Sequence, residues 1–418
     1  MNQTRFSKIE IIDVVKQAEA GISVKELMRK YGVCKQTRVN ILFSYGLVGR
    51  GGDAVQTASM IDALISLGHT VRVAGPTLLH PYQFSGKTGH IRSGLRRLPW
   101  WAKDGIDIGL SVIGLAKVRR LLAQNEVDLI LHRSSLYDLI GANLPKSVGC
   151  PLITYLDAPW PLERAFRKEG YFARFHRRTM RKMAERANLM VTVSQSSKEY
   201  YTALGLPVEK ILVQPNGISG HLLQKGTILA KAHPPLTKPT RTLGFLGSLS
   251  RWHRVDLLLE ALVILKHKGE GSLHLRIVGY GEEFEKLRQK AEALGVAEQV
   301  NWIGALSHEQ AFSQIAQFDI AVLPHTLSSG APMKLVEYAA VSRPIVAPSL
   351  PNLHRLFSED EICFVKPKSP QALAQAISRL LRAPEMARKL GERAWIRARQ
   401  YTWERIMDEI LATLSHAK

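Results

Sequence analysis

From residue 39 onward, short apolar strands alternate with amphipathic helices, and this alternation restricts the fold more than any other feature. The segment Val39–Phe43 predicts a strand, Gly51 and Gly52 lie in the loop after it, Ala54–Leu67 predicts a helix and Thr70–Ala74 the next strand. A strand, a glycine-containing loop, a helix and a strand form a βαβ unit, whose two strands run parallel in one sheet. Later strands of this half are predicted at Leu129–His132, Leu152–Leu156 and Met190–Val193.

The same alternation starts again after residues 218–240, where Pro234, Pro235 and Pro239 predict a linker. The chain has 418 residues, which suits two domains better than one. We therefore predict an α/β fold with two facing, doubly wound, Rossmann-like domains. Their predicted ranges are 38–217 and 241–400, with residues 401–418 as a helix that crosses back to the first domain.

Residues 1–37 differ in kind from the rest of the chain and predict a short helical extension. Ser7–Glu10 and Ser23–Glu26 are capping boxes, and the glycine turns after each helix give a helix-turn-helix pattern. The stretch IIDVVKQAEAGISVKELMRKYGVCKQT resembles the helix-turn-helix of insertion-sequence transposase subunits. The recognition helix is cut short by the strand at Val39, so we interpret residues 1–37 as a remnant. We do not expect nucleic acid to be a partner of the chain. DNA binding through residues 1–37 stays an alternative.

Cysteine spacing, apolar run length and net charge limit where the chain is expected to act and what it is expected to bind. The three cysteines are far apart, which argues against a disulfide framework and fits a reducing cytosol. The N-terminus lacks the pattern of a signal peptide, and no apolar run is long enough to cross a bilayer. We therefore expect a cytoplasmic protein. The net charge of +21 leaves nucleic acid, an anionic membrane surface and anionic substrates as partner classes, beside a general basic drift.

Two basic stretches with interleaved aromatic residues, 163–186 and 87–101, fall in the first predicted domain. Basic amphipathic helices with aromatic side chains suit an anionic leaflet. Our hypothesis is peripheral binding to the inner face of the membrane and a lipid-linked or otherwise anionic acceptor. The alternative is a solvated basic helix.

Glycine-containing loops before helices mark a candidate anion site in both halves. Besides Gly51 and Gly52, the loop Gly247–Arg254 follows the first strand of the second domain, and Gly279 and Gly281 open another helix. Glycine lets the backbone approach a ligand closely, and helix N-termini favour anions. The spacing does not match the GxGxxG dinucleotide pattern.

The segment Ser329–Tyr338 is the most informative single stretch. A loop containing Gly330 leads into a helix that carries Lys334 at its start and Glu337 one turn in. The helix dipole favours an anion at that N-terminus, and Glu337 would face the cleft if the apolar neighbours face the core. The alternative is that the Glu337 carboxylate only stabilises the N-terminal end of the helix through its dipole.

Five blocks in this order resemble group 1 (family 4) glycosyltransferases with the GT-B architecture. They are ILFSYGLVGRGGDAVQTASMIDALISLGHTVRVAGP, VTVSQSSKEYYTALGLPVEKILVQPNGI, GFLGSLSRWHRVDLLLEALVIL, LRIVGYGEEFEKLRQKAEALGVAEQVNWIGALSHEQ and LSSGAPMKLVEYAAVSRPIVA. The resemblance implies a retaining transferase that moves a sugar from a nucleotide-diphosphate donor to a glycan or lipid-linked acceptor, in cell-surface polysaccharide or glycolipid synthesis. It implies no metal and no cofactor. The donor-binding residues predicted from pattern and resemblance together are Gly51, Gly52, Ser248, Arg251, His253, Gly279, Gly281, Ser329, Gly330, Met333, Lys334 and Glu337.

Departures from the family pattern leave the chemistry open. Glu337 matches the second glutamate of the family's E-x7-E motif, which holds the ribose hydroxyls, but Ser329 stands at the first. The arginine–lysine pair that neutralises the diphosphate falls at Ser248 and His253, so Arg251, Arg254 or Lys334 would have to supply the charge. Asp157 is the catalytic candidate, in the loop where the family often has a histidine. An inactive protein or another GT-B enzyme, such as a nucleotide-sugar epimerase, stays an alternative.

Overall fold

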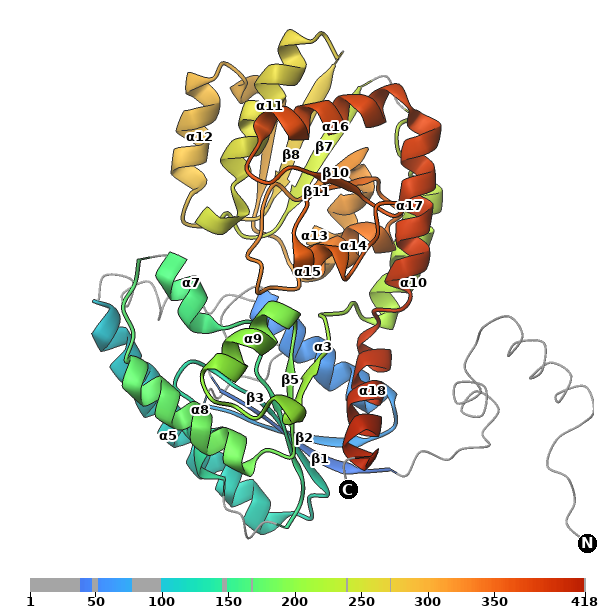
Figure 1. Ribbon diagram of the computed structural model, residues 1–418. Helices are drawn as coiled ribbons and strands as arrows, with labels where there is room; N and C mark the ends of the chain where they lie inside the picture. Colours follow the sequence, from blue (N-terminus) through green and yellow to red (C-terminus); the bar gives the residue numbers. More distant parts are fainter. Residues whose placement is uncertain are drawn as a thin grey trace, which may run out of the picture.

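The computed structural model describes residues 38–46, 52–76, 99–144, 149–166, 168–237, 240–270 and 272–416. Within these ranges the strands form two six-stranded parallel sheets with helices on both faces, so the predicted fold class is confirmed (Figure 1). The remnant at residues 1–37, Gly51 and most of the basic stretch 87–101 lie outside the described residues.

The first sheet has the strand order β2-β1-β3-β4-β5-β6. Its strands are β1 (Asn40–Tyr45), β2 (Thr70–Ala74), β3 (Leu129–Arg133), β4 (Leu152–Tyr155), β5 (Leu189–Thr192) and β6 (Ile211–Val213). The helices of this half are α3 (Gly52–Ser66), α5 (Trp100–Gln124), α6 (Leu139–Asn143), α7 (Trp160–Phe166), α8 (Ala173–Arg186) and α9 (Gln195–Ala203). The central strands β3 and β4 are buried along their whole length because helices cover both sides of the sheet.

The second sheet has the strand order β12-β11-β10-β7-β8-β9. Its strands are β7 (Arg241–Leu246), β8 (Leu273–Val278), β9 (Val300–Gly304), β10 (Ile320–Val322), β11 (Ile345–Pro348) and β12 (Cys363–Val365). Its helices are α11 (Val255–His267), α12 (Phe284–Ala293), α13 (His308–Gln314), α14 (Met333–Ala340), α15 (Pro351–His354), α16 (Pro370–Arg382) and α17 (Pro384–Ala398). The short strands β6 and β12 were not predicted, because three residues carry too little periodicity.

The predicted linker, residues 218–240, contains a helix that the sequence analysis did not predict, α10 (Gly220–Ala232). Ser219 caps it by accepting a hydrogen bond from the backbone N–H of Leu222. Pro234 and Pro235 lie just beyond the helix end, where proline is common because it cannot continue a helix. The prolines marked the end of a helix instead of an irregular segment.

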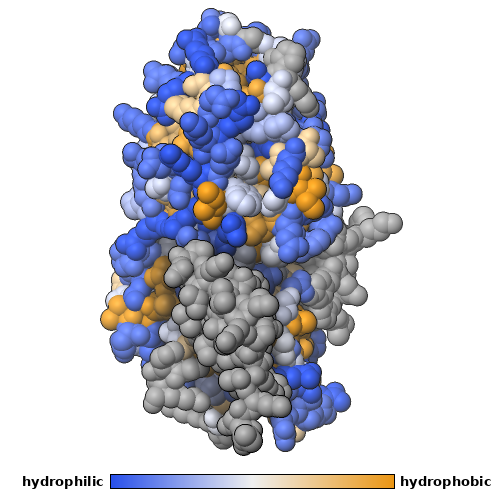
Figure 2. Space-filling view, turned by 90° about the vertical axis from the view of Figure 1, so that its right-hand side faces the viewer, coloured by the Kyte–Doolittle hydropathy of each residue, from blue (hydrophilic) through white to orange (hydrophobic). Residues whose placement is uncertain are grey.

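The chain passes between the two halves twice, and the two crossings lie side by side. A parallel bridge joins Ile218 and Thr402, and the N–H of Trp403 donates to the Ile218 carbonyl at 2.9 Å. The last helix, α18 (Trp403–His416), then packs against α3 of the first half (Figure 1). Seen from the side, the molecule is elongated along the line joining the halves, with a mainly hydrophilic surface (Figure 2).

Candidate donor and acceptor site between the two sheets

In each sheet the order in which the strands are added reverses at one point. In the first sheet the strand order reverses between β1 and β3, and in the second between β7 and β10. Loops diverge at such a point beyond the carboxyl ends of the strands, which opens a crevice for a ligand. The loop after β10 contacts the first half directly, since the Ser329 carbonyl accepts hydrogen bonds from the Ser194 and Ser197 hydroxyls at 2.8 and 2.6 Å.

The loop after β7 brings His253 against Lys334 of α14. Nδ1 of His253 lies 2.7 Å from the Ser248 carbonyl oxygen, and Nε2 lies 3.0 Å from Nζ of Lys334. A carbonyl oxygen only accepts, so Nδ1 carries the proton and Nε2 presents its lone pair to the lysine. Burial, and then the positive charge of Lys334, hold the pKa of His253 well below its ordinary value. His253 is therefore a neutral acceptor.

Lys334 is a partly buried cation in unusual surroundings. Its Nζ lies 4.6 Å from the centre of the Phe245 ring, and desolvation lowers its pKa from 10.5 to about 7, against the opposing charge of Glu337. A Cβ on Gly247, whose φ is +136°, would lie 2.4 Å from Nζ, so the glycine leaves the space that the ammonium fills.

Glu337 lies one turn further along α14 and is buried, with 6% of its surface exposed. One of its carboxylate oxygens, Oε1, is 2.7 Å from Nε2 of His308, the first residue of α13. Burial alone would lower the pKa of His308, but the hydrogen bond and charge of Glu337 raise it overall. The carboxylate is thus oriented by a side chain that the sequence did not single out.

Four further predicted donor residues fall into two groups. Gly330 and Met333 lie in the loop after β10 and at the start of α14, where the Asn352 side chain donates to the Gly330 carbonyl at 2.8 Å. Gly279 and Gly281 pack against the loop after β7, because a Cβ on either would lie 2.0 to 2.6 Å from backbone atoms of Gly247 or Leu249. These two glycines allow the close approach of two loops.

Arg251 and Arg254 are differently placed from Lys334. The Arg251 side chain is 46% exposed and its Nε lies 3.9 Å from Glu283. The Arg254 guanidinium makes a two-pronged contact with Asp256, through Nε and Nη2 at 2.9 Å each. Gly52, the first residue of α3, has open space where a Cβ would stand.

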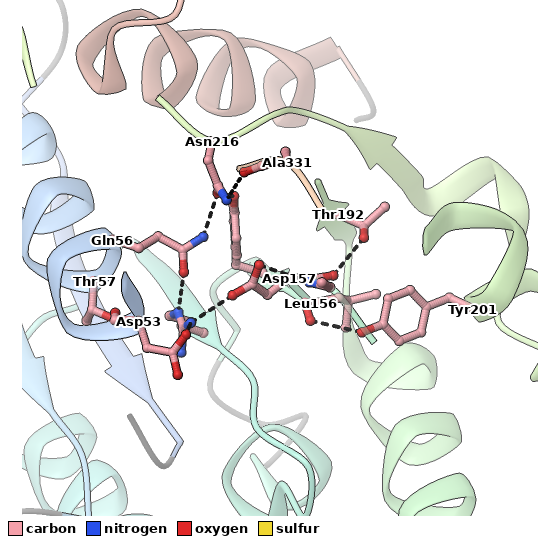
Figure 3. A network of polar contacts seen from close by, with 12 residues as sticks. Asp53, Gln56, Thr57, Leu156, Asp157, Thr192, Tyr201, Asn216 and Ala331 are labelled. Atoms are coloured by element: carbon pink, nitrogen blue, oxygen red, sulfur yellow. Dashed lines mark hydrogen bonds and ion pairs between the residues drawn. The ribbon is translucent and has the colours of Figure 1, made fainter. Parts of the chain in front are cut away.

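On the first half, Asp157 lies just beyond β4 in a left-handed backbone conformation, with φ of 56°. Its Oδ2 accepts a hydrogen bond from Nη2 of Arg133 at 2.8 Å, and its Oδ1 accepts from the N–H of Ala158. Arg133, the last residue of β3, is fully buried and its Nη2 also lies 3.5 Å from Asp53 at the start of α3. The network therefore joins the loops after β1, β3 and β4 (Figure 3).

The same network reaches the second half through side-chain amides (Figure 3). Nε of Arg133 donates to Gln56 at 2.9 Å, and the Gln56 amide donates to Asn216 at 2.6 Å. Asn216 in turn donates to the carbonyl of Ala331 at 2.9 Å. The Asp157 region and the loop after β10 are thus coupled by hydrogen bonds.

Sequence reasoning missed Arg133, Gln56, Asn216 and His308. Arg133 had a usable signal, because a charged residue directly after a buried parallel strand lies at the ligand edge of the sheet. The others depend on pairing between segments that are far apart in the chain, and local pattern carries no trace of it.

Two family models match the chain, one for each half. The family described as Glycosyltransferase Family 4 matches residues 50–219, and the one described as Glycosyl transferases group 1 matches residues 230–396. The chain belongs to the group 1 (family 4) glycosyltransferases. This family assignment accounts for the two facing sheets and for the order of the five blocks.

Among curated relatives of this glycosyltransferase chain are the D-inositol 3-phosphate glycosyltransferase of Segniliparus rotundus and the MMP alpha-(1->4)-mannosyltransferase of Mycolicibacterium hassiacum. They are 27% and 25% identical, each over 62% of this chain, and the matches span 56% and 61% of the relatives. The chain thus spans little more than half the length of these relatives.

Solved structures agree with the glycosyltransferase fold. Anabaena Alr3699/HepE, solved in complex with UDP and glucose, is 20% identical with a TM-score of 0.64, covering 91% of this chain and 100% of that one. The sucrose-phosphate synthase of Thermosynechococcus elongatus is 18% identical with a TM-score of 0.67, covering 91% and 100%. At these identities the likeness establishes the architecture.

Neither a metal cluster nor a spanning helix is found in the part of this glycosyltransferase that the structure describes. No group of three or more His, Cys, Asp or Glu side chains there is arranged to hold a metal ion. No helix there is long and apolar enough to cross a membrane.

Proposed function

We propose that this chain transfers a sugar from a nucleotide-diphosphate donor, bound on the second half, to an acceptor bound on the first. The observation that carries the proposal is Glu337, a buried carboxylate on the helix that begins at the switch point of the second sheet. A carboxylate held by His308 is suited to accept hydrogen bonds from the hydroxyls of a ribose. Relatives support the donor class, since Alr3699/HepE was solved with UDP-glucose.

The test is thermal unfolding of the full chain with UDP, GDP, ADP and their glucose or mannose conjugates. A ligand that binds the folded state raises the melting temperature, by mass action. We expect one nucleotide family to raise it, and Glu337→Ala to remove most of that rise. Glu359→Ala, which removes a carboxylate outside the cleft, is the matched control. No shift with any nucleotide would contradict a donor site of this kind.

On the first half, we propose Asp157 as the catalytic group. Its carboxylate is anchored by Arg133 and the Ala158 N–H at the edge that faces the second half. A fixed negative charge at this edge can stabilise the positive charge that develops on a sugar ring as its bond to phosphate breaks. Retention of anomeric configuration is proposed from the family resemblance alone, and nuclear magnetic resonance of the first product tests it. The proposal uses no metal.

An anionic, lipid-linked or glycan acceptor is the finer part of the proposal. Helix α8 exposes a row of cations that line a shallow hollow of about 360 Å³, namely Arg174, Arg177, Arg178, Arg181 and Lys182. Phe172, at the N-terminal end of α8, is 38% exposed, and Trp101 of α5 is 57% exposed. Cations with aromatic neighbours suit an anionic lipid surface, in which each cation contributes on the order of 1 kcal/mol.

Flotation with vesicles separates this surface from a merely solvated helix. We expect the chain to float with vesicles containing phosphatidylglycerol at low salt and to stay behind with neutral phosphatidylcholine vesicles. Replacing Arg177, Arg178 and Arg181 by Gln should abolish flotation, while the same change at Arg288, Arg393 and Arg405 on other faces should not. Equal flotation of both triple variants would remove α8 as the membrane contact.

A further inference from the structure

The start of α14 and the loop after β7 surround a cation, Lys334, that forms no ion pair with a carboxylate in the described part of the chain. Nζ of Lys334 has the neutral ring of His253 at 3.0 Å and the Phe245 ring at 4.6 Å. In the described part of the chain no carboxylate lies within the 4.0 Å of an ion pair to it, and Glu337 on the same helix is turned to His308. A desolvated ammonium whose near contacts are neutral rings is costly, and an anionic ligand beside it would relieve that cost.

Several features of the chain hold the ammonium at this place. Gly247 leaves the space it fills, since a Cβ there would lie 2.4 Å from Nζ. The Ser248 carbonyl fixes the His253 tautomer, so Nε2 accepts from the lysine. Lys334 also lies in the first turn of α14, whose dipole favours an anion at the same end. These observations come from two elements, the loop after β7 and α14.

The alternative cations are less suited to the role. Arg254 is committed to Asp256 through two hydrogen bonds at 2.9 Å. Arg251 is 46% exposed and points toward Glu283, 3.9 Å away. Lys334, in contrast, contacts His253, which stands where the family resemblance expects the diphosphate-binding lysine.

We propose that Lys334, oriented by His253, is the cation that holds the donor diphosphate, in place of the lysine that the family pattern has at position 253. On this proposal the charge comes from the start of α14 instead of the loop after β7. This inference rests on the proposed function, because the anion is the diphosphate of the nucleotide sugar.

The experiment moves the lysine from position 334 to position 253. Binding of UDP is measured by calorimetry for the full chain, for Lys334→Met and for the double variant His253→Lys/Lys334→Met. Loss of a charge-assisted hydrogen bond weakens binding by about 10- to 100-fold, so we expect that loss in Lys334→Met. The double variant should recover most of it, because its lysine reaches the same space from the other side. Arg288→Met, which removes a distant surface cation, should bind as the parent does.

Each outcome separates the inference from the function it rests on. Parent protein that binds no nucleotide diphosphate refutes the proposed function. Parent and Lys334→Met that bind UDP equally well would overturn the inference and leave the donor site standing, with Arg251→Met as the next variant. Failure of the double variant alone, with its melting temperature intact, would show that position 334 itself is required and would overturn the transposition. We expect Lys334→Met to keep the melting temperature of the parent, because methionine fills the same space and removes a desolvated charge.

Discussion

Single residues in the cleft carry charges whose titration can be observed. Desolvation lowers the pKa of Lys334 to about 7, so the free protein loses this proton around neutral pH, whereas the unfolded chain keeps it to 10.5. The unfolded state therefore binds more protons between these values, and the contribution of Lys334 to the free energy of unfolding rises with pH across that window. Below pH 7 the buried charge reduces stability.

Binding of a diphosphate has the opposite dependence on pH. An anion beside Lys334 favours the charged form, so the complex takes up a proton above about pH 7 and the Kd for UDP should rise toward tenfold per pH unit. Calorimetry in buffers of different ionisation enthalpy measures the uptake. Lys334→Arg should remove it, since arginine stays charged throughout. His308, His253 and His325 are present in both proteins, so an equal slope in both would assign the proton to one of these histidines.

Asp157 offers a second prediction at this scale. We expect Asp157→Asn to lower turnover by about 100-fold or more, because the amide keeps the shape and removes the charge. The Kd for UDP should not change, since Asp157 lies on the other half. Steady-state kinetics with the donor identified by thermal unfolding gives both constants. Unchanged turnover, with Glu409→Gln as a surface control, would contradict a catalytic role.

At the scale of elements, α10 positions the helix that carries the donor site. Gly226 of α10 packs so closely on the end of α14 that a Cβ would lie 2.5 Å from the Ala340 carbonyl oxygen. Helix α10, which the sequence analysis did not predict, therefore supports α14, the helix that carries Lys334 and Glu337.

Gly226→Ala tests this contact. Two helix backbones would have to separate, so we expect a loss of about 1 to 3 kcal/mol in the free energy of unfolding, measured with urea. Gly105→Ala in α5 is the matched control, because a Cβ there meets nothing within 4 Å. That change should raise stability by roughly 0.5 to 1 kcal/mol, since alanine loses less conformational freedom in a helix. Two variants of equal stability would contradict the close packing of α10 on α14.

At the scale of the whole molecule, the two halves meet through hydrogen bonds to carbonyl groups of the loop after β10. Ser197 donates to Ser329 at 2.6 Å and Asn216 donates to Ala331 at 2.9 Å. The same loop leads into α14, so closure of the halves and the shape of the donor site depend on each other. The paired crossings at Ile218 and Thr402 sit at one side, where a hinge would lie.

Ser194 also donates to the Ser329 carbonyl, at 2.8 Å, so Ser197 and Asn216 are two of three donors. Removing these two should loosen this closure. We expect Ser197→Ala/Asn216→Ala to enlarge the radius of gyration in small-angle X-ray scattering and to lower turnover more than it lowers the melting temperature. Ser313→Ala, whose hydroxyl donates to Glu309 within one helix, is the control for loss of a serine hydroxyl. An unchanged scattering profile would show that these bonds do not hold the halves together.

The sequence by itself determined the alternation of strands and helices, the two parallel sheets and the family, because periodicity and motif order are local properties of the chain. It also singled out Glu337, Lys334 and Asp157 as candidates. Tertiary structure decided their partners. His308 meets Glu337 across 29 positions of sequence and Arg133 meets Asp157 across 24, and no local pattern encodes such contacts. Burial also sets the pKa of Lys334, and only the folded structure distinguishes this desolvated side chain from the exposed Arg251.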